Sequence, residues 1–413
     1  MGEVCQIFGR IGFRGYTKED LVYSDGAITL SPSNIVNGKM SYENCTYITW
    51  TKYEESPEIK ISNNDIILVK TGSSYGKCAL VTQLPHEATI NPQFVVLKYI
   101  LYNTRLLSYV LQSGYARYNY DQFVLGTAIP TFTQAVLANM KIPLPPQKEQ
   151  IKIVETIERW FSVIDNIKED ANALESLIKK TKSKILNLAI SGKLVPQDPN
   201  DEPAIELLKR INPNFVPCDN SHYENSPFEI PESWEWTTLG ELCTFLSRGK
   251  SPKYSEERIY PVFAQKCNLK DGGISLEQAR FLDPDTICKW DSKYKLRNGD
   301  VLVNSTGTGT VGRTRLFNES CLGEYPFVVP DSHVSVVRAS AYMETKYVLA
   351  ILTSQWGQQY IEENLAGSTN QKELYIGVLE DMFFPIPPLE EQRRIVDRIE
   401  SLYKYLNIIT AEL

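Results

Sequence analysis

The feature that most constrains this 413-residue chain is a long amphipathic helix pattern near its middle. The proline pair Pro145 and Pro146 cannot lie inside a helix, so it marks where the helix begins. No Pro or Gly then interrupts the chain until Gly192, a natural helix stop. Apolar residues recur at heptad spacing along this stretch: Ile157, Phe161, Ile164, Ala171, Leu174, Ile178, Ile185 and Leu188. A helix of about 45 residues would be about 65 Å long, and its apolar stripe needs a second helix to cover it.

The sequence contains a second copy of this helix start near its C-terminal end. IPLPPQKEQIKIV at 142–154 matches FPIPPLEEQRRIV at 384–396, and Met140 matches Met382. Two unrelated helices could each follow proline, but Glu-Gln after Pro-Pro has no general reason to occur twice. We therefore interpret the match as an internal repeat. The repeated positions are Pro143, Pro145, Pro146, Glu149, Gln150, Ile153, Val154, Ile157 and Glu158, aligned with Pro385, Pro387, Pro388, Glu391, Gln392, Ile395, Val396, Ile399 and Glu400.

The composition is that of an ordinary globular protein, and the length allows two or three domains. The eight cysteines form no Cys-x-x-Cys pair and only three histidines are present, so we expect no zinc site. Reduced thiols in a cytosolic protein fit better than a disulfide framework. The sequence shows no signal peptide and no apolar run of transmembrane length, so we expect a cytoplasmic location. A net charge of −7 argues against a simple nucleic-acid coat protein, so nucleic-acid binding would need local basic patches or a partner.

Each half of the chain carries the same order of segments before its Pro-Pro motif. GEVCQI at 2–7 matches GELCTF at 240–245, but only the second copy follows an expected loop and strand, FEIPESWEWTTL at 228–239. We therefore expect the N-terminus to be trimmed relative to its own repeat. The patterns predict turn, strand, Gly-rich loop and strand at 62–81 and 297–317, strands at 94–99 and 334–338, helices at 104–111 and 344–363, polar loops at 113–127 and 366–374, and a short helix within 192–211 before a loop at 212–227.

The doubled PPxxEQxxIV, with GKLVPQDP at 192–199 and IPESWEWTTLGEL at 230–242, resembles the specificity subunit of type I restriction–modification systems. The likeness covers essentially the whole chain. It implies two target recognition domains, each of which reads one half of a bipartite DNA site. It also implies two helices that pack antiparallel as a spacer and dock methyltransferase (modification) subunits. The methyltransferase and the endonuclease translocase would then be separate chains.

The expected fold is therefore mixed α/β (α+β), with two target recognition domains of small β-sheets joined by long helices in an antiparallel coiled coil. The repeat would relate the halves by a pseudo-two-fold. The expected domains are 1–141 for the first recognition domain, 142–227 for the central helix and linker, 228–383 for the second recognition domain and 384–413 for the C-terminal helix. Two departures from the family stand out: the first domain lacks the usual lead, and the last helix stops at Leu413 at about half the length of the central one. Whether such a chain is a functional subunit stays open.

Cationic, aromatic and small polar residues gather in the loops of both halves, and their chemistry suits phosphate and base-edge contacts. Exposed polar loops without any ligand would have a similar composition. The candidates in the first half are Arg10, Arg14, Tyr16, Lys18, Lys70, Ser73, Ser74, Lys77, Arg117, Tyr118 and Asn119. Those in the second half are Arg248, Lys250, Lys253, Tyr254, Asn304, Thr308, Thr310, Arg313, His333, Thr369, Asn370, Gln371 and Lys372. The lysines at 179–184 are interpreted as a solvated helix face, with contact to DNA or a partner as the alternative.

Two motifs suggest enzymes, but their context does not support them. GTGTVGRT at 307–314 nearly satisfies the P-loop pattern, yet a strand rather than a helix is expected to follow. A hairpin turn, or a loop that binds a DNA phosphate, fits better. NPQF at 91–94 distantly resembles the Asn-Pro-Pro-Phe/Tyr signature of adenine methyltransferases, but one proline is missing and a turn that opens a strand is the simpler interpretation.

We therefore expect a DNA sequence-recognition subunit with no catalytic residue, no metal and no cofactor of its own. S-adenosylmethionine is expected in the partner methyltransferase subunit. The expected partners are double-stranded DNA, the methyltransferase subunits and the endonuclease/translocase subunit, with no membrane. The repeated residues Glu149, Gln150, Glu391 and Gln392 are candidates for partner contacts. The alternative is a non-catalytic coiled-coil scaffold with two protein-binding heads.

Overall fold

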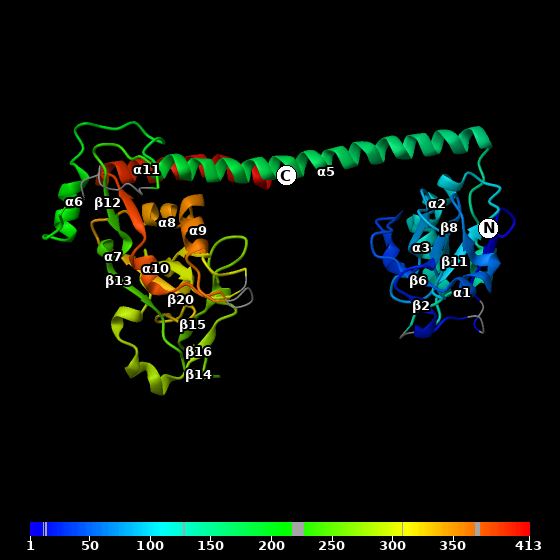
Figure 1. The fold of residues 1–413 in the computed structure, drawn as a ribbon, viewed down its shortest axis with the longest axis horizontal. Coiled ribbons are helices and arrows are strands. Elements are labelled where there is room, and N and C mark those ends of the chain that lie inside the picture. The colour runs from blue at the N-terminus through cyan, green and yellow to red at the C-terminus, as the bar shows by residue number, and fades with distance from the viewer. Residues whose placement is uncertain (11, 13–14, 127–128, 217–226, 308, 368–371) are drawn as a thin grey trace. The chain divides into compact units, whose positions relative to one another are not determined.

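The computed structural model describes residues 1–413 except 11, 13–14, 127–128, 217–226, 308 and 368–371 (Figure 1). The chain divides into two compact units, Met1–Lys168 (unit 1) and Glu169–Leu413 (unit 2). The boundary between them falls inside the long helix α5 (Gln147–Ile190). Each unit combines small β-sheets with helices, which confirms the predicted mixed α/β class.

Unit 1 contains two sheets and a short hairpin. The first sheet has the order β1-β11-β8-β9 and is antiparallel throughout; the second has the order β2-β6-β3-β10-β7, in which β3 and β10 are parallel. The strands are β1 (Gln6–Phe8), β2 (Leu21–Val22), β3 (Ala27–Leu30), β4 (Ile35–Val36), β5 (Lys39–Met40), β6 (Thr46–Ile48), β7 (Lys60–Ile61), β8 (Ile66–Val69), β9 (Cys78–Leu80), β10 (Ala88–Ile90) and β11 (Phe94–Lys98). The helices are α1 (Trp50–Glu54), α2 (Thr104–Gln112), α3 (Gly114–Phe123), α4 (Gln134–Asn139) and the first part of α5.

Unit 2 repeats this plan and adds one further pair of strands. Its sheets have the orders β13-β20-β17-β18, β14-β16-β15-β19 and β12-β21. The strands are β12 (Glu235–Thr238), β13 (Cys243–Arg248), β14 (Tyr254–Ser255), β15 (Pro261–Phe263), β16 (Arg280–Leu282), β17 (Val301–Asn304), β18 (Thr314–Leu316), β19 (Val329–Pro330), β20 (Val334–Ala339) and β21 (Phe383–Ile386). The helices are α6 (Ala204–Ile211), α7 (Leu239–Leu242), α8 (Thr345–Thr353), α9 (Gln355–Glu363), α10 (Ile376–Glu380) and α11 (Leu389–Ala411).

The central strands of each unit are apolar on both sides because two cores need them. Ile66 and Leu68 of β8 point into a core shared with α2 and α3, whereas Ile67 and Val69 point into a core shared with the second sheet. In unit 2, Val301 of β17 faces the helices and Leu302 faces the other sheet. The continuous apolar runs in the sequence are therefore strands buried on both faces.

The internal repeat is more extensive than the sequence pattern indicated. The predicted helix at 344–363 is two helices, because Ser354 ends α8 and its hydroxyl accepts from the Gly357 N–H to begin α9. Ser113 does the same between α2 and α3, where its hydroxyl accepts from the Ala116 N–H. The prediction of a polar loop over 113–127 was therefore wrong for most of its length, since 114–123 is helix α3. The polar composition of α3 reflects its exposed face, which a pattern search interprets as loop.

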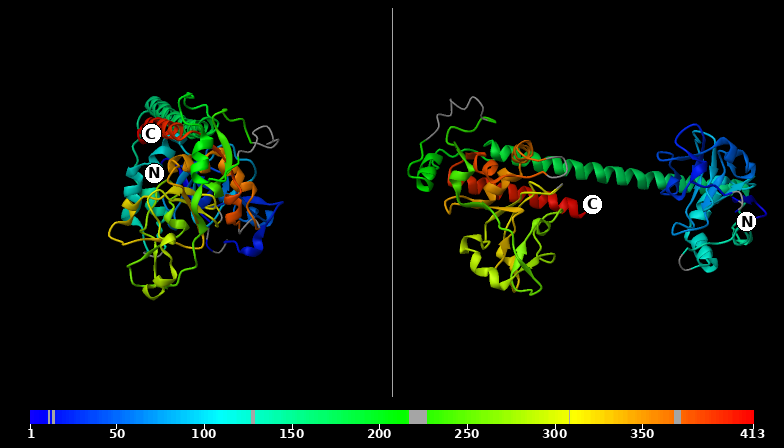
Figure 2. Two further views of the ribbon diagram at one scale, coloured as in Figure 1. Left: turned by 90° about the vertical axis from the view of Figure 1, so that its left-hand side faces the viewer. Right: turned by 60° about the horizontal axis from the view of Figure 1, so that its bottom comes forward.

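Helix α11 packs antiparallel against the C-terminal part of α5, as the two views in Figure 2 and the view in Figure 1 agree. The Tyr403 hydroxyl donates to the Lys182 carbonyl at 3.1 Å, and Lys182 Nζ donates to Asn407 Oδ1 at 2.6 Å. The pairing is limited by length, since α11 has 23 residues and α5 has 44. The predicted apolar stripe is therefore covered only in part: Ile185 is buried, whereas Phe161 and Ile164 are 49% and 42% exposed.

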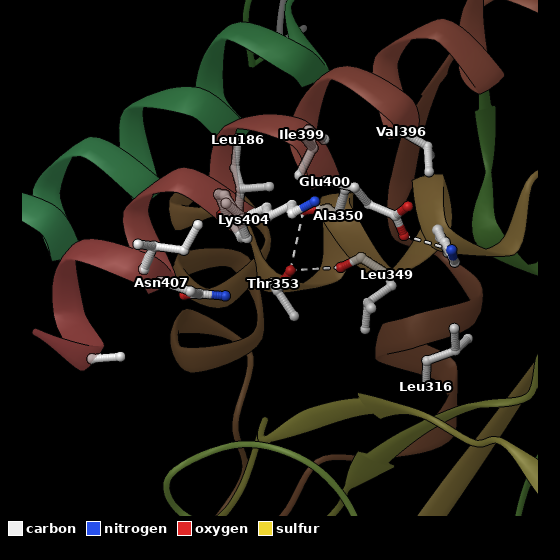
Figure 3. Close-up of a pocket in the computed structure, with 14 residues that line it drawn as sticks. Leu186, Leu316, Leu349, Ala350, Thr353, Val396, Ile399, Glu400, Lys404 and Asn407 are labelled. Carbon is white, nitrogen blue, oxygen red and sulfur yellow. Dashed lines mark hydrogen bonds and ion pairs between the residues drawn. The ribbon is translucent and has the colours of Figure 1, made fainter. Parts of the chain in front are cut away.

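Figure 3 shows where α5, α8 and α11 meet in unit 2. Leu186 of α5, Ala350 of α8 and Ile399 of α11 line one apolar groove of about 710 Å³. At its rim Lys346 of α8 forms an ion pair with Glu400 of α11. Unit 1 has the same pairing, because Arg105 of α2 lies 3.1 Å from Glu158 of α5. The two long helices thus attach to their units in the same way.

The repeated glutamine of the Pro-Pro motif fixes each long helix to its unit. Gln150 Oε1 accepts from the Asn103 backbone N–H at 2.9 Å, and its Nε2 donates to the Pro145 carbonyl at 2.9 Å. Gln392 makes the same two bonds, to the Glu344 N–H at 3.1 Å and the Pro387 carbonyl at 3.0 Å. Both side chains are buried, and each amide provides a hydrogen-bond partner for one backbone N–H and one backbone carbonyl near helix N-termini, where the helix itself provides none.

The repeated glutamate has different surroundings in the two units. Glu391 is fully buried, and its carboxylate accepts from Trp234 Nε1 at 2.9 Å and from Gln197 Nε2. Burial is the largest influence on this carboxyl and raises its pKa above the usual value. Glu149 is exposed. Three of the four predicted partner contacts, Gln150, Glu391 and Gln392, are thus already bonded inside the chain, and their side chains offer no surface to a partner. A repeated polar motif in a sequence does not reveal whether its side chains are buried, and for this reason these three residues were predicted to contact partners.

We expect Glu391→Ala to lower the free energy of unfolding of unit 2 by about 1–3 kcal/mol, because it leaves the buried indole N–H of Trp234 without an acceptor. Glu149→Ala is the matched control in the other unit and should change stability by less than about 0.5 kcal/mol, because its side chain is exposed. Chemical denaturation followed by tryptophan fluorescence measures both. Equal effects for the two variants would contradict this account of the motif.

A buried ion pair makes a second stability prediction. Asp300 is 1% exposed and binds Arg338 Nε and Nη2, each at 2.7 Å, while Asp65 binds Lys98 at 2.9 Å at the equivalent place. Arg338→Ala should destabilise unit 2 by about 3–5 kcal/mol, because it leaves a buried carboxylate unpaired. Arg297→Ala, which leaves this ion pair intact, is the control for loss of a neighbouring cation. A loss below about 1 kcal/mol for Arg338→Ala, measured by denaturant titration, would show that water reaches Asp300.

Candidate nucleic-acid interface

Several loops of unit 2 meet where strands of the sheet β13-β20-β17-β18 begin or end, on one side of the sheet along the strand direction. Strands β13 and β17 end there at Arg248 and Asn304, and β20 begins there at Val334. The register places these ends together, because Arg248 pairs with Ser335 and Asn304 pairs with Val334. The 3-10 turn Gln265–Cys267, which follows β15 of the second sheet, joins the same side through the side chain of Gln265.

A chain of hydrogen bonds links these loops. Gln265 Nε2 donates to Thr306 Oγ1 at 2.7 Å, and Gln265 Oε1 accepts from Thr310 Oγ1 at 3.0 Å. Thr306 Oγ1 also lies 2.8 Å from His333 Nδ1. The backbone N–H of His333 donates to Asp331 Oδ1 at 2.9 Å. Because each member fixes its neighbour, the network presents its polar groups in one arrangement.

Gln265, Thr310, Asp331 and His333 of this network line a polar cavity of about 540 Å³. Cationic side chains dominate its wall, and the carboxylate present is Asp331; the cations are Lys266, Lys270, Arg280 and Arg313. Burial raises the pKa of the Asp331 carboxyl above its usual value. The balance of charge therefore favours an anionic ligand, although the whole chain carries a net charge of −7.

Side chains beneath the cavity hold the Gly/Thr loop in place. Arg313 Nη1 donates to the Asn268 carbonyl at 2.7 Å, and Asn268 Nδ2 donates to Asn304 Oδ1 at 2.7 Å. The loop has the expected hairpin form, since strand β18 follows it directly at Thr314. A P-loop would continue into a helix at this point, with the helix N-terminus facing phosphate. This position of the chain is therefore not built as a nucleotide-binding loop.

Unit 1 has the same loops with different side chains. The Thr71 and Thr131 hydroxyls lie 2.8 Å apart where Thr306 pairs with Glu373 in unit 2. The Gln93 N–H donates to Asn91 Oδ1 at 3.0 Å, as His333 does to Asp331. Residues 91–94 thus form the expected turn that opens a strand, and Gln93 occupies the place of His333.

The Gly/Ser loop of unit 1 is braced by helix α3. Arg117 stacks on the Tyr75 ring with its guanidinium carbon 4.1 Å from the centroid, and its Nη1 donates to the Tyr75 carbonyl at 2.9 Å. The predicted residues Ser73 and Lys77 of this loop are exposed and Ser74 is half-buried. Lys70, at the end of β8, is half-buried, and burial lowers the pKa of its amino group.

Two predicted DNA contacts, Arg10 and Asn304, are buried and hold the fold together instead. Arg10 is 6% exposed, and its guanidinium donates to the Ile90 carbonyl and the Thr89 hydroxyl, both at 3.1 Å. Asn304 is fully buried and bonded to Asn268. Arg248 is half-buried and binds the Ser332 carbonyl and Glu373, so its contact with DNA stays a prediction. The assignments of Arg10 and Asn304 are corrected, because buried polar side chains need partners inside the protein, and here backbone and side-chain groups supply them.

The other predicted residues that the structure describes lie nearer the surface. Lys250 is exposed, with its amino group 4.4 Å from the Tyr294 ring centroid, and Lys253 pairs with Asp283 at 2.7 Å. The remaining exposed or half-buried candidates are Tyr16, Lys18, Tyr118, Asn119, Tyr254, Thr310, Arg313, His333 and Lys372. Arg14, Thr308, Thr369, Asn370 and Gln371 lie outside the described residues. Contact of any of these residues with DNA stays a prediction.

Sequence analysis missed the residues that organise the site: Gln93, Gln265, Thr306 and Asp331. The available signal was the internal repeat, because NPQF at 91–94 aligns with DSHV at 331–334 once the following strands are matched. Gln265 lies in a turn without a distinctive motif, and its position could not be found from sequence.

Three further features of the described residues concern metal ligands, cysteines and membrane spans. No group of three or more His, Cys, Asp or Glu side chains in that part of the chain is placed to hold a metal ion. Every cysteine that the structure describes is a free thiol. Among the helices described, none has both the length and the hydropathy that a bilayer span requires.

Comparison with known sequences gives one family. The profile of the type I restriction modification DNA specificity domain matches residues 2–176 and 231–413. The chain is 25% identical to the type I restriction enzyme EcoEI specificity subunit of Escherichia coli, covering 84% of this chain and 65% of that protein. It is 30% identical to the EcoAI specificity subunit of the same organism, covering 60% and 44%. These alignments span less than two thirds of both relatives.

Solved structures show the same fold. The HsdS subunit from Thermoanaerobacter tengcongensis is similar with a TM-score of 0.55 and 20% identity, covering 100% of this chain and 90% of that one. A chain from a structure that describes complex assembly and conformational transition of the type I R-M system is similar with a TM-score of 0.59 and 20% identity, covering 100% of this chain and 90% of that one. The family profile matches two segments that together make up most of the chain, one around each Pro-Pro motif. This chain therefore belongs to the family of type I restriction modification DNA specificity domains.

Proposed function

We propose that this chain is the DNA sequence-recognition subunit of a type I restriction–modification complex. Each unit reads one half of a bipartite DNA site. The long helices dock the methyltransferase subunits, and the endonuclease/translocase joins the full complex. Family membership and the names of the relatives support this proposal.

One observation carries the proposal: the same loop cluster is built twice on one scaffold with different side chains. The bridges Thr71–Thr131 and Thr306–Glu373 occupy equivalent places, and so do the turns at Asn91 and Asp331. A protein that must read two different half-sites needs this combination, because backbone geometry positions the reader and side chains select the bases. A scaffold with two protein-binding heads has no need for the same polar loop cluster in both units, or for the cation-lined cavity of unit 2.

The groups at the cavity of unit 2 suit a nucleic acid in two respects. The exposed His333 offers its imidazole, which Thr306 orients through Nδ1, to a base edge in the major groove. Lys266 and Lys270 offer point charges to phosphates. In unit 1 the amide of Gln93 and the amino group of Lys77 have the corresponding roles. A glutamine amide suits the edge of adenine, whereas a histidine suits guanine acceptors, so the two halves should prefer different bases.

Methylation and cleavage reside in partner chains under this proposal, and S-adenosylmethionine binds to the methyltransferase subunit. The described residues contain a hairpin where a P-loop was considered and a strand-opening turn where a methyltransferase motif was considered. The decisive experiment is genome-wide methylation mapping after co-expression with the cognate modification subunit. A bipartite methylated motif is the expected result, and its absence would favour the protein-binding scaffold.

Base recognition can be tested one half at a time. His333→Ala should relax one base position in the half-site that unit 2 reads, and Gln93→Ala should relax one position in the other half-site only. Each lost contact should reduce discrimination by about 1–3 kcal/mol. Methylation mapping of both variants reads the result. Relaxation of both halves by one variant, or of neither half by either, would contradict the assignment.

Phosphate contacts should behave differently. Lys266→Ala and Lys77→Ala should weaken DNA binding about equally on all sequences and reduce the slope of log Kd against log salt by about 1. Lys209→Ala is the control, because Lys209 lies on α6 and pairs with Glu206 at 2.9 Å. Fluorescence anisotropy of the reconstituted complex at several salt concentrations gives the slopes. An unchanged slope for both test variants would remove these lysines from the interface.

The cofactor assignment has a direct calorimetric test. S-adenosylmethionine titrated into the purified chain should give no binding heat, and heat should appear once a methyltransferase subunit is added. The chain alone should also neither methylate nor cut DNA. Saturable binding of the cofactor to the isolated chain would contradict the proposed division of labour.

A further inference from the structure

One arginine on the wall of the polar cavity of unit 2 differs from the other cations there. Arg280 lies on β16, is exposed, and holds its guanidinium carbon 3.5 Å from the centroid of the Tyr254 ring. Both residues line the cavity of about 540 Å³. A guanidinium that stacks on an aromatic face at this distance has the orientation of its plane fixed by the ring.

The strand pairing of the second sheet brings these two side chains together. In the antiparallel pairing of β14 with β16, Tyr254 lies opposite Leu282. Arg280 precedes Leu282 by two residues, so its side chain is on the same face of the sheet, diagonal to Tyr254. Val262 of β15 lies opposite Arg280 and also lines the cavity. This face of the sheet is therefore one wall of the cavity, and paired strands carry the stacked residues.

The hydrogen-bond donors of the Arg280 guanidinium are not used within the protein. No described residue forms an ion pair or a hydrogen bond with this guanidinium, although the carboxylate of Asp331 lines the same cavity. Arg313, by contrast, donates to a backbone carbonyl at 2.7 Å. Lys266 and Lys270 carry their charges on flexible stems and act as point charges. Arg280 therefore combines a fixed plane with a free set of donors.

Unit 1 has no arginine at the equivalent place. The strand registers make Thr46 of β6 the counterpart of Arg280, since each lies two strands across from the strand that leads into the equivalent turn. Arg10 and Arg117 of unit 1 also lie over tyrosine rings, but both donate to backbone carbonyls. The two loop clusters therefore differ in whether a stacked arginine is open to a ligand.

A fixed guanidinium with free donors suits a base edge better than a phosphate. A phosphate can be neutralised by a mobile point charge, which carries no sequence information. Guanine presents two acceptors, N7 and O6, in one plane of the major groove, and they match two N–H groups of an arginine. Stacking on Tyr254 also reduces the side-chain freedom that would be lost on binding. His333, the other candidate base reader of unit 2, lines the same cavity.

We propose that Arg280 reads a guanine in the half-site of unit 2, with two N–H groups of its guanidinium donating to N7 and O6 of that base. Tyr254 is a positioning residue, because its ring holds the plane of the guanidinium and does not need to touch the base. This inference rests on the proposed function and adds to it a specificity-determining residue and the base that it selects.

The test uses the full chain in complex with its modification subunit and maps the methylated motif genome-wide. The unaltered complex should give a bipartite motif with guanine at a fixed position of one half-site. Arg280→Ala should reduce the preference for that guanine by about tenfold to a hundredfold, because one bidentate contact is lost, and should leave the other half-site unchanged. Arg258→Ala is the matched control, because Arg258 is exposed and lies 5.2 Å from the Phe281 ring centroid but does not line the cavity.

Conservative variants separate a base contact from a phosphate contact. Arg280→Lys keeps the positive charge without the planar fork, so it should lose most of the guanine preference and keep the slope of log Kd against log salt. Tyr254→Phe keeps the ring and should keep the preference. Tyr254→Ala should lower the preference by about two- to fivefold, because the guanidinium plane is no longer held. Fluorescence anisotropy of the complex on duplexes with that base pair exchanged gives the preferences, and circular dichroism checks the fold of each variant.

Three results would overturn the proposal. The first is a bipartite motif without guanine in either half-site. The second is an unchanged motif for Arg280→Ala. The third is equal weakening by Arg280→Ala on all sequences with a smaller salt slope and rescue by Arg280→Lys, which would make Arg280 a phosphate contact. In all three cases the bipartite motif of the unaltered complex would still support the proposed function, whereas the absence of any bipartite motif would overturn both.

Discussion

A single buried amide at the start of each long helix holds the rest of the structure in register. Gln150 and Gln392 each join the first turn of a long helix to the first turn of the helix beneath it. A helix N-terminus has backbone N–H groups without partners. Without the amide, the Asn103 and Glu344 N–H groups would lack this acceptor, and the Pro145 and Pro387 carbonyls would lack this donor. The amide can satisfy both sides because it carries an acceptor and a donor on one planar group. The Pro-Pro pair before it sets the angle at which the chain enters the helix.

This anchoring does not involve the loops at the far ends of the strands, so the side chains of those loops can differ between the two units. The central strands are buried on both faces, so their side chains pack in the two cores and are not accessible to a ligand. The loops at the far ends carry polar groups that are fixed by one another, as Gln265, Thr306 and His333 are. Binding residues are often found on loops over a rigid scaffold for this reason. Two units with the same scaffold and different loop side chains are suited to two different ligand sequences.

The repeated helices and strands could be predicted from the sequence. Predictions that depended on which side chains are buried were wrong in two places. The strands around Asp65 and Asp300, the long helix and its second copy followed from apolar periodicity and from the doubled motif, whereas their antiparallel packing was implied by the family resemblance. Arg10 was assigned to DNA because arginine in a Gly-rich stretch is typical of phosphate contacts, but its guanidinium lies inside and bonds to Ile90. Helix α3 was taken for a loop because its surface residues are polar and aromatic. In both cases the deciding fact was which residues from distant parts of the chain lie nearby, and one sequence does not contain that information.

The turns at Asn91 and Asp331 have a consequence for how such a protein can change. In both, a side-chain oxygen accepts from the N–H two residues later, at 3.0 and 2.9 Å, and this bond shapes the backbone before the strand. An amide and an ionised carboxylate both supply that oxygen, but they differ by one unit of charge, and in unit 2 the carboxyl of Asp331 lines the polar cavity. Exchange of one for the other would therefore change the electrostatic potential that a phosphate group meets at this place, while the path of the backbone stays the same. Under the proposed function, such an exchange would change the affinity for nucleic acid in one unit and leave the other unit unchanged.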